Sequence, residues 1–179
     1  SGTEKTRQLS AGFVFVGYGI KDARYRIDDY RGLDLRGKIA VALSGTPKGL
    51  PSDIDAHIAS SKDRFAAEAG AIGYVEVPRN DGQRGNGVAR GGRPLIDWVD
   101  KSGKAGSVPP GMRLSLTLSG EWAERLFEGA ARSLDAVRKE AKANSKASPR
   151  GFALRPVLTV QSDSKWEDFT SPEVVGLLK

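Results

Sequence analysis

The sequence contains no cysteine and a single histidine, His57, among its 179 residues. Without cysteine, the chain cannot form disulfide bonds, cysteine nucleophiles or thiolate metal sites. A tetrahedral zinc site needs three or four ligands, which are usually His and Cys side chains. A Ser/His/Asp triad would depend on His57 alone. We therefore expect no catalytic residue, no metal ligand and no cofactor within this chain.

Long apolar runs are also absent, and none approaches the roughly 20 residues that a membrane-spanning helix needs. The first residues, Ser-Gly-Thr-Glu-Lys, include neither an initiator Met nor an apolar signal-peptide region. We therefore expect residues 1–11 to be a flexible segment or tag remnant, and we expect no membrane span.

Charge of one sign is not dominant, although 28 Lys and Arg against 22 Asp and Glu give a net charge of +6. Such a charge makes nucleic acid or an anionic envelope surface a partner to consider. The acidic residues are interleaved with the basic ones, however, and no nucleic-acid-binding motif accompanies them. The densest basic stretch, residues 132–155, is typical of a solvated helix face that continues into a polar linker. We expect no nucleic-acid partner.

Apolar periodicity predicts a mixed β/α chain. Strands are expected at residues 13–17, 38–43, 71–77, 114–118, 152–161 and 174–178, and helices at 55–69, 121–129 and 134–142. Gly70 stands where a C-cap glycine is common, and Ser119 and Ser133 can cap the two later helices. The order strand–helix–strand within residues 38–77 indicates a parallel βαβ unit. The expected fold class is α+β, with a β-sheet or partly open barrel flanked by two or three helices.

Two acidic clusters have simple structural interpretations. Asp53, Asp55 and His57 lie at an expected helix start, where acids stabilise the helix dipole and cap free N–H groups. Asp28 and Asp29 suggest a calcium loop, but no closing Glu follows at the required spacing. We therefore expect helix capping in the first case, and in the second a turn in which Asp bonds its own backbone.

The segment 78–111 is rich in glycine and shows little periodicity. Loops of this length are usually functional or mobile, and we take this one as a candidate substrate-facing loop. Its candidate residues are Asp81, Arg84, Asn86, Arg90, Arg93 and Trp98. Core or domain contact is the default interpretation of Trp98, Trp122 and Trp166; Trp122 is expected in the core, and Trp98 could be exposed. Glycine patterns at residues 16–19 and 85–87 lack the context of phosphate-binding loops.

Four segments share their pattern with a known family. They are residues 14–20 (Val-Phe-Val-Gly-Tyr-Gly-Ile), 28–41 (Asp-Asp-Tyr-x-Gly-Leu-Asp-Leu-x-Gly-Lys-Ile-Ala-Val), 62–73 (Lys-Asp-Arg-x-Ala-Ala-x-Ala-Gly-Ala-x-Gly) and 170–178 (Thr-Ser-Pro-Glu-Val-Val-Gly-Leu-Leu). They resemble the protease-associated (PA) domain inserted in metallopeptidase family 28, the two-zinc aminopeptidases related to glutamate carboxypeptidase II. The resemblance covers most of residues 12–77 and about 157–178. It departs from the family at Glu173, where Asn is common, and finds no counterpart for residues 78–111.

The resemblance implies a PA domain of the swivelling β/β/α type over residues 12–170, and at 171–179 the start of a strand that re-enters a missing catalytic domain. In these peptidases the ligands of the two zinc ions lie in the catalytic domain, so no catalytic or metal residue is carried over to this chain. The parent would be a periplasmic or extracellular zinc aminopeptidase. This domain would act there as a lid or substrate-access domain, with the catalytic domain and the peptide substrate as partners. The alternative is a free-standing PA module that binds peptides or proteins.

Overall fold

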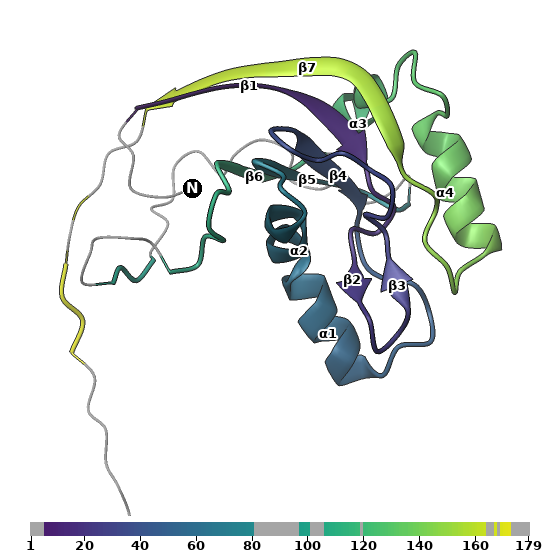
Figure 1. Cartoon of the computed structure of the whole chain (residues 1–179), viewed down its shortest axis with the longest axis horizontal. Coiled ribbons are helices and arrows are strands. Elements are labelled where there is room, and N and C mark those ends of the chain that lie inside the picture. The colour runs from purple at the N-terminus through teal and green to yellow at the C-terminus, as the bar shows by residue number, and fades with distance from the viewer. Residues whose placement is uncertain are drawn as a thin grey trace, which may run out of the picture.

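A mixed β-sheet organises the chain, as Figure 1 shows. The computed structural model describes residues 6–80, 97–100, 106–118, 120–163, 167 and 169–172. The sheet has five strands in the order β6-β5-β4-β1-β7, of which β1, β4, β5 and β6 are parallel and β7 is antiparallel to β1. The strands are β1 (Thr6–Phe15), β4 (Ile39–Leu43), β5 (Gly73–Val77), β6 (Leu114–Thr117) and β7 (Phe152–Asp163). The expected α+β class is confirmed.

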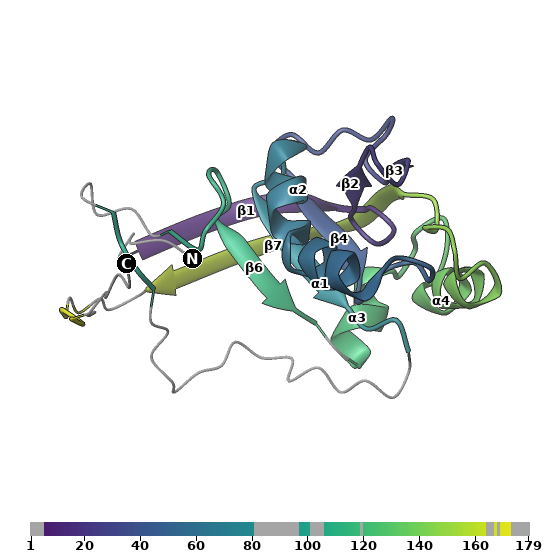
Figure 2. The same ribbon diagram turned by 90° about the horizontal axis from the view of Figure 1, so that it is seen from below.

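Helices cover both faces of this sheet, which explains why β4 is an uninterrupted apolar run with all of its residues buried. Helices α1 (Ser52–Ser60) and α2 (Lys62–Glu68) lie on one face, and α3 (Glu121–Leu126) lies on the other (Figure 2). Helix α4 (Leu134–Ala143) stands at the end of the molecule toward which β4 and β5 point (Figure 1). No helix among the described residues is long and apolar enough to cross a membrane.

The first strand is longer than the sequence predicts. Residues 6–11, expected to be loose, belong to β1, where Leu9 and Ala11 are buried. They are held by β7, whose pairing with β1 begins at Thr6 opposite Asp163. The register shifts between Gly12 and Val14. Pro156 lies in the β7 stretch opposite this shift, and because proline has no N–H to donate, it is tolerated at such an irregularity of an edge strand.

The single helix expected at residues 55–69 is divided into α1 and α2 at Ser61. The Ser61 hydroxyl donates to the His57 carbonyl at 2.8 Å, a local bond that competes with helix continuation. The expected C-cap at Gly70 is present, with φ of +91° and its N–H bonded to the Ala67 carbonyl at 2.9 Å. A small hairpin of β2 (Lys21–Asp22) and β3 (Ile27–Asp28) was not predicted.

Three phenylalanine rings pack together on the face of the sheet that α3 covers. Phe15 lies 5.5 Å from Phe127 and 5.3 Å from Phe152, measured between ring centroids. Trp122, expected in the core, is instead 59% exposed, because α3 buries Ala123 and Leu126 and turns Trp122 to solvent. Three further predictions lie outside the described residues. They are the helix cap at Ser119, the position of Trp166 and the strand at 174–178.

Candidate functional site

Trp98 is the one residue of the predicted substrate-facing set that the structure describes. It is 67% exposed, and its carbonyl accepts a hydrogen bond from the Gly106 N–H at 2.9 Å. The neighbouring Asp97 carboxylate accepts the Ser107 hydroxyl at 2.6 Å. These contacts hold Asp97 and Trp98 beside Gly106 and Ser107. The other predicted residues, Asp81, Arg84, Asn86, Arg90 and Arg93, lie outside the described residues.

The acidic clusters are structural, but the expected helix capping by Asp53 and Asp55 is wrong, because α1 begins after Pro51 without a side-chain cap bond. Asp53 and Asp55 lie in the first turn of α1, where the Asp55 carboxylate also accepts the Thr46 hydroxyl. His57 is exposed on the same helix. The Asp28 carboxylate accepts the Tyr30 N–H at 3.2 Å, which is the expected Asx-turn. In the described part of the chain, no group of three or more His, Cys, Asp or Glu side chains is arranged to hold a metal ion.

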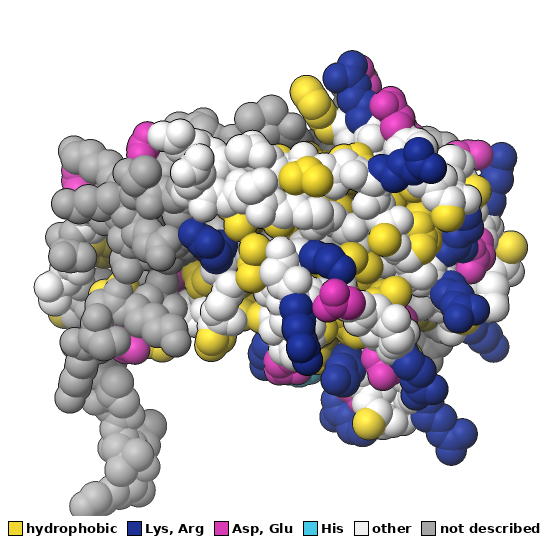
Figure 3. Space-filling model, turned by 45° about the horizontal axis from the view of Figure 1, so that its top comes forward, with side chains coloured by type: hydrophobic (Ala, Val, Ile, Leu, Met, Phe, Trp, Pro, Cys, Tyr) yellow, Lys and Arg dark blue, Asp and Glu magenta, His cyan; other side chains and the backbone are white. Residues whose placement is uncertain are grey.

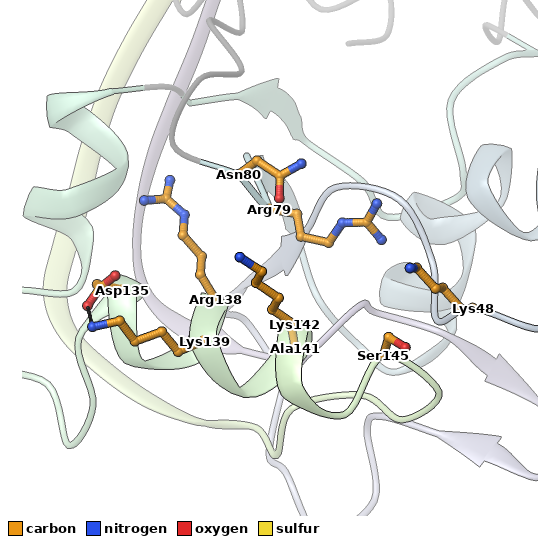
Figure 4. Close-up of a pocket in the computed structure, with 9 residues that line it drawn as sticks. All are labelled: Lys48, Arg79, Asn80, Asp135, Arg138, Lys139, Ala141, Lys142 and Ser145. Carbon is orange, nitrogen blue, oxygen red and sulfur yellow. Dashed lines mark ion pairs between the residues drawn. The ribbon is translucent and has the colours of Figure 1, made fainter.

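A pocket of about 530 Å³ lies where β4 and β5 end (Figure 4). We call it the basic pocket, and its lining is Lys48, Arg79, Asn80, Asp135, Arg138, Lys139, Ala141, Lys142 and Ser145. Open α/β sheets commonly bind ligands outside the carboxyl ends of their strands. The basic pocket occupies that position in this fold, and it was not predicted from the sequence.

One wall of the basic pocket comes from the loops that follow β4 and β5. Arg79 lies two residues after β5, and its N–H donates to the Ser44 hydroxyl at 3.0 Å. Its guanidinium donates to the Thr46 carbonyl at 3.1 Å. The Lys48 N–H donates to the Ser145 carbonyl at 2.6 Å, which ties this loop to the segment after α4. These bonds fix the backbone from which Lys48 and Arg79 project.

The opposite wall is one face of α4. Asp135, Arg138, Lys139 and Lys142 follow one another at helical spacing and therefore share that face. In Figure 4, Arg138 and Lys142 extend from α4 toward the side on which Arg79 lies. The signal in the sequence is this spacing, but residues 132–155 alone are equally typical of a solvated helix.

Arg138 anchors α4 to the sheet. Its side chain is only 9% exposed, and its Nε donates to the Pro78 carbonyl at 3.0 Å. Its Nη1 forms an ion pair with Glu124 of α3 at 2.5 Å. A buried arginine with both a carboxylate and a carbonyl partner is a structural element of the pocket wall.

The remaining charges of the basic pocket are not balanced. Lys139 pairs with Asp135 at 2.8 Å, the dashed contact of Figure 4. Among the described residues, no carboxylate pairs with Lys48, Arg79 or Lys142. On the face of the molecule that Figure 3 shows, Asp and Glu side chains lie among the Lys and Arg side chains. The basic pocket is therefore a local excess of positive charge.

A buried ammonium lies on the other side of β5, outside the basic pocket. The Lys62 Nζ donates to the Leu43 carbonyl at 2.8 Å and lies 3.4 Å from the Glu76 carboxylate. Burial lowers the pKa of Lys62, and the charge of Glu76 opposes this effect. Tyr74 donates to the same carboxylate at 3.3 Å. The Leu43 carbonyl and the Glu76 carboxylate together satisfy the buried ammonium. Lys62 thereby joins α2 to the sheet.

No protein-family model matches this sequence, and a search of the curated proteins finds no match. The resemblance to PA domains therefore rests on the four motif segments of the sequence.

Proposed function

We propose that this chain is a non-catalytic PA domain of a larger exported zinc aminopeptidase, in which it acts as a lid or substrate-access domain beside the active site. The observation that carries this proposal is the place of the motif segments in the fold. Residues 14–20 and 28–41 include the end of β1 and the start of β4, and residues 62–73 include α2 and the start of β5. Since β1, β4 and β5 are neighbours in the sheet, these three of the four matching segments lie side by side.

The apolar residues of the first motif, including Phe15, are all core residues. Val14, Val16, Tyr18 and Ile20 are all buried. Buried positions report on fold more directly than on function, so the role of a lid comes by analogy with relatives. The parent would supply the zinc ions and the metal-activated water that hydrolyses the peptide bond, and this chain would shape access to them.

The intact protein from the full reading frame tests the proposal. We expect the frame to continue into a segment with a His-x-Asp pattern and further His and acidic residues. The purified protein should contain zinc and release N-terminal amino acids from peptides in a chelator-sensitive reaction. An intact protein that neither binds zinc nor hydrolyses peptides would refute the peptidase assignment.

The role of Trp98 can be separated from general effects of surface tryptophans. In the intact enzyme, Trp98→Ala should raise KM for peptide substrates by about threefold to tenfold with little change in stability, since the side chain is exposed. Trp122→Ala is the matched control, because Trp122 is also exposed but lies on α3. Equal KM values for both variants and the unmodified enzyme would show that Trp98 does not contact the substrate.

A free-standing peptide-binding module is the second candidate, and β6 is the feature that favours it. Among the described residues β6 pairs only with β5, and an edge strand of this kind is where an extended peptide can add to a sheet. Peptide binding by this chain alone, with backbone chemical-shift changes confined to Leu114–Thr117, would support that function. No shift with a peptide library at high concentration would leave the lid proposal in place.

A further inference from the structure

The basic pocket has no role in the proposed lid function. We propose that it binds a small molecule through a phosphate monoester group. This proposal concerns residues of this chain alone and holds whether or not the parent is a peptidase.

The charge of the pocket sets the charge of the ligand. Arg138 is paired with Glu124 and Lys139 with Asp135, which leaves Lys48, Arg79 and Lys142. A single carboxylate would neutralise one of these three cations. A phosphate monoester carries about −1.5 to −2 at pH 7 and presents three acceptor oxygens on one centre, which suits three cations that line one pocket better.

The donor types also suit phosphate. The planar guanidinium of Arg79 can hold two phosphate oxygens at once, whereas the two lysines act as mobile point charges. Asn80 and Ser145 add neutral polar side chains to the lining. Among the described lining residues the one carboxylate, on Asp135, is held by the Lys139 ammonium at 2.8 Å, so its repulsion of an anion is reduced.

The pocket is built before any ligand arrives. Arg79 is anchored through its backbone and its guanidinium, and the bond from Lys48 to Ser145 fixes the distance between the two walls. A volume of about 530 Å³ lies within the range of roughly 300–1,000 Å³ that small-molecule sites occupy. It therefore has room for a phosphate group and an organic substituent such as a sugar.

The first experiment is calorimetric titration of this chain at low ionic strength. The probes are inorganic phosphate and ribose 5-phosphate, with ribose and succinate as references. We expect both phosphates to bind, with affinity that falls as salt is added, ribose not to bind, and succinate to bind about tenfold more weakly because its two charges are separated. Tighter binding of the ester than of inorganic phosphate would show that the pocket also contacts the sugar.

The second experiment uses variants. Lys48 and Lys142 are exposed, so the double variant Lys48→Ala/Lys142→Ala should fold normally and lose about tenfold or more in phosphate affinity. Lys38→Ala is the control. This substitution removes one positive charge at the amino-terminal end of β4, which is the end opposite the basic pocket. Three results would overturn the proposal. They are no phosphate binding by the unmodified chain, succinate binding as tight as phosphate binding, or a loss of phosphate affinity in the double variant no greater than that in Lys38→Ala.

Discussion

Among single residues, Asp29 couples stability to pH. Its carboxylate accepts the Ile20 N–H at 2.9 Å in the turn after β1. Burial raises the pKa of Asp29 from 3.8 to about 6. The folded state therefore holds this proton more tightly than the unfolded state, so the contribution to the free energy of unfolding is highest below pH 3.8 and falls as pH rises to about 6. A shift of this size corresponds to about 3 kcal/mol.

The variant Asp29→Asn keeps an oxygen acceptor for the Ile20 N–H but cannot titrate. We expect the wild-type free energy of unfolding to fall by about 2–3 kcal/mol relative to the variant between pH 4 and pH 7. Urea unfolding of both proteins at the two pH values measures this difference. Asp28→Asn removes the same charge at the preceding, exposed residue and serves as the control. Parallel pH profiles for wild type and Asp29→Asn would contradict the assignment.

Gly17 tests whether the turn after β1 is packed as tightly as the structure shows. Its φ is +65°, and an added Cβ would lie 2.6 Å from the Pro149 carbonyl oxygen. Gly32 has a similar φ of +75° with nothing within 4 Å of an added Cβ. We expect Gly32→Ala to cost about 1–2 kcal/mol from backbone strain, and Gly17→Ala to cost about 1–3 kcal/mol more from the clash. Denaturant unfolding measures both, and equal losses would argue against close packing of Gly17.

At the scale of an element, α4 carries one wall of the basic pocket and begins at a defined cap. The Ser133 hydroxyl accepts the Ala136 N–H at 3.2 Å. Ser133→Ala should therefore lower the free energy of unfolding by about 1 kcal/mol. The control is Ser52→Ala, at the start of α1, whose N-cap Pro51 makes no side-chain cap bond. Urea unfolding of the two variants should separate them, and an equal effect would mean that the Ser133 cap adds nothing.

Elements that depend on local chemistry were predictable from the sequence. The cap at Ser133 and the C-cap at Gly70 follow from side-chain and backbone preferences within a few residues. The division between α1 and α2 was missed because the helical pattern continues through Ser61. The extent of β1 was missed because Thr6 is placed by Asp163, which no local pattern can reveal.

The basic pocket shows the same limit for a site. Lys48 and Lys142 come from loops and helices that are distant in sequence, and Arg79 follows a strand between them. Each cation by itself is typical of a solvated surface. Their convergence depends on the order of strands in the sheet and on the docking of α4 through Arg138, so it appears only in the folded chain.

For the whole molecule, the long ribbon of β1 and β7 is the main non-local connection (Figure 2). Strand β7 pairs with β1 from Thr6 to Phe15, whereas β4 pairs only with Phe13 to Phe15. Phe152 of β7 also completes the aromatic cluster around Phe15. Removal of β7 would thus expose an open sheet edge and part of the core.

We therefore expect the chain shortened to residues 1–150 to show no cooperative thermal or urea unfolding transition, since the loss includes the pairing of β1 and the contact of half-buried Phe152 with Phe15, an aromatic pair worth about 0.5–1.5 kcal/mol beyond its area. The chain shortened to residues 1–163 keeps β7 and is the control, and it should unfold with a midpoint close to that of the full chain. Circular dichroism measures both transitions. If residues 1–150 unfolded cooperatively with the same midpoint as residues 1–163, the three residues of β1 paired with β4 would suffice to hold the strand, and β7 would be an addition to the fold rather than a condition for it.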